Sequence, residues 1–136
     1  MVSACLVGRN CKYNGGNNLN ASLIAFLEGK KVIPVCPEVA GGLPTPRLPA
    51  EIVDGEVRRR DGVSVDLEYR RGAEACLEIA MREKPDIVIL QSRSPSCGVN
   101  QIYDGTFTGT RIDGSGVFAE LLKGNGFAVV DVEDLG

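Results

Sequence analysis

Short, unbroken apolar runs alternate with longer segments of helical character, and this alternation most limits what the chain can fold into. The clearest runs are residues 87–90, Ile-Val-Ile-Leu, and residues 128–130, Ala-Val-Val. Strands buried on both faces of a parallel sheet are continuous apolar runs of this kind. Strands that alternate with helices favour a parallel sheet with right-handed crossovers. We therefore predict a three-layer, Rossmann-like α/β domain with a small, mostly parallel sheet.

Caps, helix breakers and turn residues place the other elements. Strands are predicted at residues 1–7, 32–35, 87–90 and 127–130, and helices at 20–28, 66–83 and 115–123. Residues 53–65 are expected to form a short β-hairpin insertion with its turn at Arg60-Asp61-Gly62. Two stretches, 36–51 and 92–113, are expected to be irregular, and long irregular loops in compact domains are usually functional. A length of 136 residues suits a single domain, 1–136.

Composition limits the partners and the compartment. The chain has no run of about 18 apolar residues and no basic, apolar leader, so we expect neither a membrane span nor a signal peptide. A net charge of −3 argues against a nucleic-acid-binding surface. We therefore expect a cytoplasmic protein, in which the five cysteines, an odd number, would be reduced thiols. The sequence does not indicate an oligomeric state.

Three of the cysteines stand where a predicted strand ends. Cys5 ends the first strand, Cys36 follows the second, and Cys97 lies shortly after the third. The crevice beyond the carboxyl ends of the strands is where open α/β sheets bind ligands. Three thiols in one crevice could hold a soft metal and leave one coordination position open. We expect the loops 37–51 and 92–113 to form the walls of this crevice.

Several common sites are excluded by what the sequence lacks. Without histidine, the chain has no Ser-His or Cys-His pair and no His-ligated zinc, so a general acid or base must be Asp, Glu, Lys, Tyr or Cys. It has no C-x-x-C, no Walker A motif, and no dinucleotide fingerprint after the first strand. Scattered cysteines are often core residues, as expected of Cys76 inside a helix. Gly114-Ser115-Gly116 could hold an anion or simply cap the last helix.

Motifs rich in cysteine, proline and glycine are spread over nearly the whole chain. They comprise residues 3–8, 11–15, 36–38, 41–43, 45–47, 49–51, 92–98, 102–105 and 114–117. The set resembles the small bacterial family related to thiouracil desulfidase, long known only as a domain of unknown function. Cys36-Pro37-Glu38 and Ser94-Pro95-Ser96-Cys97-Gly98 are the most specific parts. The resemblance implies a [4Fe-4S] cluster bound by Cys5, Cys36 and Cys97, with the fourth iron free to take the substrate's sulfur.

Three other positions bear on this resemblance. Cys11 matches a cysteine common in the family and is either an alternative ligand or a thiol near the cluster. Asn14 and Gln91 depart from the pattern, which often has aspartate and lysine there. If either charge aids catalysis elsewhere, the activity or the substrate of this chain differs.

The resemblance predicts a desulfidase that converts the thiocarbonyl of a thiolated pyrimidine, or of a similar small molecule, to a carbonyl and releases sulfide. In such an enzyme an iron without a protein ligand would supply the Lewis acid that polarises the C=S bond for attack by water at the carbon. Glu38 is the natural proton shuttle, although a surface carboxylate or an ion pair with Arg47 is the plainer interpretation. Ser94 and Ser96 could position the ring or the water, and Ser96 could equally be a turn former.

Two other functional classes remain open from the sequence. The first is a binding protein that holds a metal or cluster and senses redox state or carries sulfur without turnover. The second is a metal-free thiol enzyme with Cys36 or Cys97 as a low-pKa nucleophile.

Overall fold

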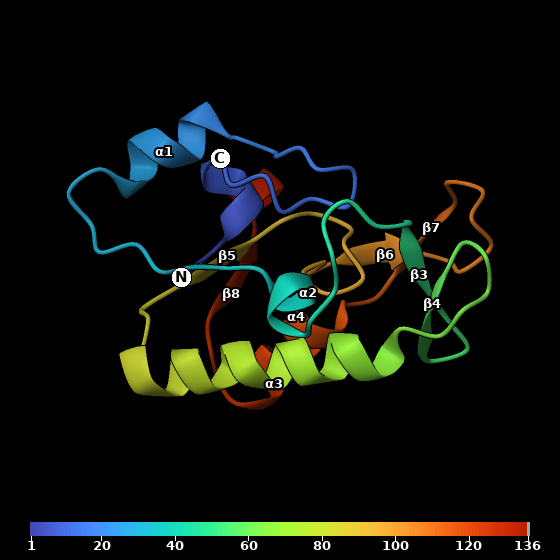
Figure 1. Cartoon of the computed structure of the whole chain (residues 1–136). Coiled ribbons are helices and arrows are strands. Elements are labelled where there is room, and N and C mark those ends of the chain that lie inside the picture. Colours follow the sequence, from blue (N-terminus) through green and yellow to red (C-terminus); the bar gives the residue numbers. More distant parts are fainter. Residues whose placement is uncertain (136) are drawn as a thin grey trace.

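A four-stranded parallel sheet lies at the centre of the computed structural model, which describes residues 1–135. Its strand order is β2-β1-β5-β8, with bounds β1 Val2–Ser3, β2 Pro34–Val35, β5 Val88–Leu90 and β8 Val129–Asp131. Helix α1 (Ala21–Leu27) covers one face, and helices α3 (Asp66–Glu83) and α4 (Val117–Gly124) cover the other (Figure 1). The three-layer α/β prediction is confirmed.

The residues of β5 show why this run is apolar throughout. Val88, Ile89 and Leu90 each expose 0% of their surface. Ile89 packs into the core cluster on the α1 side, which includes Leu23. Val88 and Leu90 belong to the larger cluster on the α3 and α4 side. Because successive strand residues point to opposite faces, a strand covered by helices on both faces needs an apolar side chain at every position.

The order of the strands creates a crevice at one point of the sheet. The chain passes from β1 through α1 to β2, and then through α3 to β5 on the other side of β1. The direction of winding therefore reverses between β1 and β5. At such a switch point the loops after the two strands diverge and leave room for a ligand.

The first strand is shorter than the predicted 1–7. It ends at Ser3, and a 3-10 helix, η1 (Ala4–Val7), follows and stops at Gly8, which has φ 94°. The neighbouring β2 ends at Val35, so no strand lies alongside the chain beyond Ser3. Cys5 is therefore placed one turn past the strand rather than within it.

The predicted hairpin is shifted. Strands β3 (Ala50–Val53) and β4 (Glu56–Arg59) pair across Asp54-Gly55, where φ is 50° and 80°. Residues 53–65 hold two Asp-Gly pairs, and the first forms the main turn because left-handed φ at both positions suits a two-residue hairpin. The predicted turn at residues 60–62 exists as a smaller second turn, closed by an isolated bridge between Arg58 and Ser64.

The two stretches predicted as irregular contain short regular elements. Helix α2 (Pro37–Ala40) lies in the first, and a hairpin of β6 (Gln101–Tyr103) and β7 (Arg111–Asp113) lies in the second. A final 3-10 helix, η2 (Val132–Asp134), follows β8. Figure 1 shows the two hairpins together at one end of the sheet. These elements were missed because three or four residues are too few for a periodic pattern.

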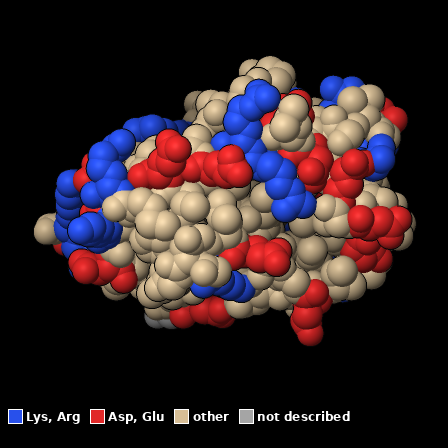
Figure 2. All heavy atoms as spheres, turned by 90° about the horizontal axis from the view of Figure 1, so that it is seen from below, with Lys and Arg blue, Asp and Glu red and all other residues tan. Residues whose placement is uncertain are grey.

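The surface over α3 carries charges of both signs. Figure 2 shows Lys and Arg side chains beside Asp and Glu on this face, and the Lys31–Glu83 pair, at 3.1 Å, is one example. No helix among residues 1–135 has the length and apolar character needed to cross a membrane.

Candidate metal centre

A cavity of about 370 Å³ opens at the carboxyl edge of the sheet. Four of the five cysteines line it: Cys5, Cys11, Cys36 and Cys97. The structure thus brings together the three cysteines that follow the predicted strands. Cys76 lies outside this lining, buried at 1% exposure in α3, as expected of a core residue.

Cys5 is held by the segment that follows η1. The side-chain amide of Asn18 donates a hydrogen bond to Cys5 Sγ at 3.6 Å, and the backbone N–H of Asn18 donates to the Cys5 carbonyl at 3.0 Å. The irregular segment 8–20 therefore forms a third wall of the cavity, which the sequence analysis missed. Its many Asn and Gly residues showed turns but not the direction in which the turns fold.

Cys36 is positioned by close packing of α2 against α3. Two glycines allow this approach: a Cβ on Gly72 would lie 1.7 Å from the Pro37 carbonyl oxygen, and one on Gly41 would lie 1.9 Å from the Glu68 carbonyl oxygen. Only a residue without a side chain fits at either place. The contact sets the start of α2, and with it Cys36, against the middle of α3.

Cys97 lies in a tight loop built on serine. Ser94 Oγ accepts hydrogen bonds from the backbone N–H groups of Ser96 and Cys97, both at 3.1 Å. Ser96 exposes 0% of its surface, and its hydroxyl donates to Cys97 Sγ at 3.6 Å. Ser94 lines the cavity, whereas Ser96 lies outside the lining and supports the cysteine from behind.

Backbone hydrogen bonds from the start of α4 hold this loop in place. The backbone N–H of Val117 donates to the Pro95 carbonyl at 2.8 Å, and that of Phe118 donates to the Ser96 carbonyl at 2.9 Å. Gly116 caps the helix so closely that a Cβ there would lie 2.5 Å from the Ser96 carbonyl carbon. These amides are engaged within the protein, so capping is the role that the structure shows for residues 114–116.

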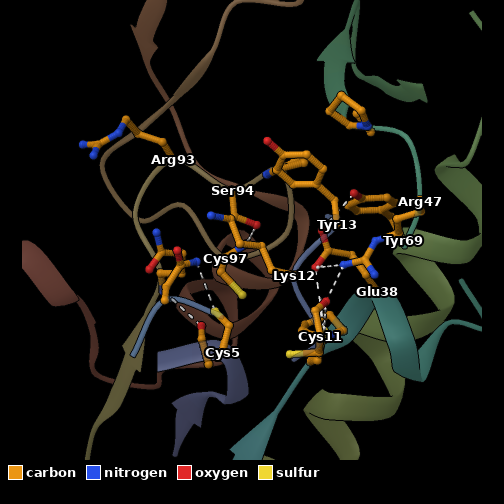
Figure 3. Close-up of a pocket in the computed structure, with 18 of the residues that line it drawn as sticks. Cys5, Cys11, Lys12, Tyr13, Glu38, Arg47, Tyr69, Arg93, Ser94 and Cys97 are labelled. Carbon is orange, nitrogen blue, oxygen red and sulfur yellow. Dashed lines mark hydrogen bonds and ion pairs between the residues drawn. The ribbon is translucent and has the colours of Figure 1, made fainter. Parts of the chain in front are cut away.

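Glu38 both lines the cavity and pairs with a cation. Its Oε1 accepts a hydrogen bond from the Tyr69 hydroxyl at 2.9 Å, and its Oε2 lies 3.5 Å from Arg47 Nη2 (Figure 3). The Cys36 thiol donates to Oε2 at 3.8 Å. The two interpretations of Glu38 from the sequence, a group facing the site and a partner of Arg47, therefore both apply.

Arg47 and Arg93 each fix a loop that lines the cavity. Arg47, with 6% of its side chain exposed, also donates to the Cys11 carbonyl at 2.8 Å. Arg93 lines the cavity and forms an ion pair with Glu133 at 2.6 Å. Each guanidinium ties a loop of the site to a distant segment of the chain.

Tyr69 is a site residue that the sequence analysis did not find. It is 3% exposed and lines the cavity from α3. Burial, with the Glu38 carboxylate next to it, raises the pKa of its hydroxyl, so the group remains a hydrogen-bond donor. Tyr69, Ala73 and Ala80 lie on the buried face of α3, and nothing local in the sequence indicated the contact of Tyr69 with Glu38.

The thiols of the cavity are hard to ionise without a metal. Burial, and secondarily the Glu38 carboxylate, raises the pKa of Cys36 from its ordinary value of 9.0 to about 12. Burial likewise raises the pKa values of Cys5 and Cys97. A bound metal favours the thiolate form and releases the protons. A cysteine that acts as a nucleophile without a metal needs a lowered pKa instead.

The donor set fits a cluster better than a single ion. Among residues 1–135, no three side chains of Cys, Asp or Glu lie close enough to hold one metal ion. An iron–sulfur cluster takes each thiolate on a different iron, so its ligands stand farther apart. Its sulfurs also accept hydrogen bonds from the protein, and the donors Asn18 and Ser96 already point at Cys5 and Cys97. Thiolates are the ligands that such clusters prefer.

Comparison with known proteins identifies the family. The model of the 2-thiouracil desulfurase family matches residues 1–134. The chain belongs to this family. It is 39% identical over 145 aligned positions to the uncharacterized protein YbbK of Bacillus subtilis (strain 168), covering 99% of this chain and 96% of that protein. A solved structure of TudS, a [4Fe-4S]-dependent thiouracil desulfidase, matches with a TM-score of 0.92 and 38% identity, over 98% of this chain and 90% of that one. The resemblance inferred from the motifs is confirmed.

Proposed function

We propose that this desulfurase-family protein is a [4Fe-4S]-dependent desulfidase that converts the thiocarbonyl of 2-thiouracil, or of a similar small thiolated pyrimidine, to a carbonyl and releases sulfide. One observation carries the proposal: Cys5, Cys36 and Cys97 line one cavity at the reversal of the sheet. Membership of the family and the likeness to TudS support it.

The three cysteines are the proposed ligands. When bound, the cluster would supply a Lewis-acidic iron that polarises the C=S bond and accepts the sulfur. Cys11 lines the same cavity and is the alternative ligand. The hydrogen-bond donors behind Cys5 and Cys97 would hold those thiolates in place and partly neutralise their charge.

Glu38 is the proposed proton carrier. Tyr69 donates to Oε1 and so fixes the plane of the carboxylate, while Oε2, which lies 3.5 Å from Arg47 Nη2, would exchange the proton. Deprotonation of Cys36 on metal binding would remove the thiol hydrogen that Oε2 accepts in the metal-free protein. Oε2 could then accept a proton from the water that attacks the carbon and return it to the substrate.

Ser94 and Ser96 have different proposed roles. The Ser94 hydroxyl lines the cavity, where it could orient the pyrimidine ring or the attacking water. Ser96 would act on Cys97 and not on the substrate, because it is buried and donates to the Cys97 sulfur. The cavity is also lined by the flat side chains of Tyr13, Tyr103 and Phe107, which suit a planar ring.

The structure weighs against one of the alternative functions. Burial raises the pKa of Cys36 and of Cys97, which does not suit a metal-free thiol nucleophile. A sensor or sulfur carrier would use the same cysteines, so turnover must separate it from an enzyme. Five unpaired cysteines support our proposal of a cytoplasmic location, where thiols stay reduced.

Anaerobic reconstitution followed by iron and sulfide analysis tests the proposal. We expect about four iron atoms and four sulfides per chain, as the formula of a [4Fe-4S] cluster requires. The loaded protein should then release sulfide from 2-thiouracil and form uracil, with no external reductant. Iron uptake without sulfide release from 2-thiouracil would favour the sensor or carrier, and failure to bind iron would reject the cluster.

A further inference from the structure

Cys11 is a thiol of the cavity that the proposed three-ligand cluster does not use. Cys11 lines the cavity together with Cys36. The Cys36 thiol also lies 3.9 Å from the Cys11 carbonyl oxygen, toward which it donates. The Cys36 thiol is therefore in direct contact with the residue that carries this additional thiol.

The backbone around Cys11 is fixed in this position. Arg47 Nη2 donates to the Cys11 carbonyl at 2.8 Å, and the backbone N–H of Arg47 donates to the Tyr13 carbonyl at 2.7 Å. Arg47 also pairs with Glu38, which follows Cys36 by two residues. One arginine thus holds the loop of Cys11 against the loop of Cys36.

The cysteines of the cavity differ in access. Cys11 is partly exposed, as are Cys5 and Cys36. Cys97 is only 4% exposed and accepts a hydrogen bond from Ser96. A dissolved reagent can therefore reach Cys11, whereas Cys97 is closed to it and the Cys36 thiol is already engaged with Glu38 and the Cys11 carbonyl.

We propose that Cys11 is a thiolation site and that Cys36 resolves the adduct into a Cys11–Cys36 disulfide when the cluster is absent. In the first step the Cys11 thiolate attacks a small-molecule disulfide such as oxidised glutathione, forms a mixed disulfide and expels one glutathione thiolate. In the second step Cys36 attacks Cys11 Sγ as its thiolate and expels the other glutathione thiolate; burial raises the pKa of Cys36, so this step is slow and is followed to equilibrium. Two protein thiols are oxidised, one glutathione disulfide is reduced to two thiols, and the two protons go to the leaving thiolates.

The Cys11–Cys36 disulfide would have a function if the protein binds the proposed [4Fe-4S] cluster. A Cys11–Cys36 disulfide withholds one proposed ligand from iron until a thiol reductant restores it, and it shields that sulfur from irreversible oxidation. This consequence rests on the proposed function. The disulfide itself does not, because it forms in the full chain without iron, so the two ideas can fail separately.

Tryptic mapping of the full, metal-free chain tests the pairing. Trypsin places the five cysteines in five different peptides, 1–9, 10–12, 32–47, 72–82 and 94–111. After equilibration with reduced and oxidised glutathione, free thiols are alkylated and the digest is read by mass spectrometry. We expect the free thiols to fall from five to three per chain and peptide 10–12 to be joined to peptide 32–47.

Single variants test the order of the steps. Cys36→Ser should leave a stable glutathione adduct on Cys11, because the resolving thiol is gone. Cys11→Ser should abolish the joined peptides, and the buried Cys76→Ser serves as the matched control that keeps them. A main product that joins peptide 32–47 to 1–9 or to 94–111, or a lasting adduct on Cys11 in the unaltered chain, would overturn the proposal. Iron uptake by the disulfide form, measured before and after dithiothreitol, tests the consequence; equal uptake would reject it.

Discussion

The hydroxyl of Tyr69 donates a hydrogen bond to Glu38 Oε1 at 2.9 Å, across the contact between α3 and α2. The two residues belong to different elements, and the glycines at the helix contact bring those elements together. Glu38 is thus oriented by a group outside its own loop, and that group can be altered without touching the carboxylate.

Tyr69→Phe should lower turnover while leaving the cluster in place. The variant keeps the buried ring and removes only the donor. A hydrogen bond to a charged group is worth about 1.5–3 kcal/mol, which corresponds to roughly a 10- to 100-fold loss if it acts mainly in the transition state. Steady-state rates of sulfide release, normalised to bound iron, give the measurement. Normal iron content with an unchanged rate would show that Tyr69 does not position Glu38.

Glu38→Gln should load iron normally and lose roughly 10²–10⁴-fold in turnover, the usual contribution of a general acid–base residue. The amide has nearly the shape of the carboxylate but does not carry a proton between water and substrate. Sulfide release from 2-thiouracil is the readout. If the variant works at the unaltered rate, the proton travels by another group, such as Glu51 in the same cavity lining.

Serine variants should distinguish the cysteines that bind iron from the cysteine that only packs in the core. Cys5→Ser, Cys36→Ser and Cys97→Ser should each bind much less iron after anaerobic reconstitution, because the hydroxyl is a poor ligand for iron–sulfur clusters. Cys76→Ser is the control, since Cys76 lies in the core and not in the cavity lining. Full iron content in any of the first three would remove that residue from the ligand set.

Gly72→Ala should destabilise the protein by roughly 1–3 kcal/mol, the usual cost of an extra methyl group in a well-packed contact. The new Cβ would lie 1.7 Å from the Pro37 carbonyl oxygen, so α2 must move away from α3. Denaturant unfolding gives the measurement. Gly124→Ala is the matched control, because nothing lies within 4 Å of its Cβ position, and it should be neutral or slightly stabilising. Equal stability of the two variants would contradict the close contact.

The metal-free protein should lose stability at alkaline pH. Burial raises the pKa of Cys36 and of Cys76 from 9.0 to about 12, so the folded chain holds these protons more tightly than the unfolded chain. The resulting stability is fully present below pH 9 and is lost as the pH rises through about 12. Unfolding free energies measured across this window, with reductant present, should fall less steeply in Cys76→Ala. An identical slope would show that the Cys76 thiol does not contribute.

The fold was predictable because its long elements carry regular patterns. Residues 66–83 were predicted as a helix, and α3 has these bounds. The apolar run 87–90 likewise marked β5 as a strand buried on both faces. The hairpin was misplaced because residues 53–65 hold two Asp-Gly pairs that could each form its turn. The local sequence of a turn does not show which pair has the better strand partners on its two sides.

Only those residues of the site that lie just after the ends of strands could be predicted. The positions of Cys5, Cys36 and Cys97 followed from topology, since parallel strands end at one edge of the sheet. The partners Tyr69 and Asn18 did not, because each acts through a contact between segments far apart in the chain. The two glycines that allow the α2–α3 contact carry no side-chain signal at all.

The strand order also determines at which step of folding the metal site is complete. β2 and β5 lie on opposite sides of β1, and β5 joins it through the pairing of Val2 with Ile89. Until that pairing forms, Cys97 is tethered only by unfolded chain and at most two of the proposed ligands are in place. A chain that ends before β5 would lack the third proposed ligand, so loading of the proposed cluster would report that β5 has joined the sheet.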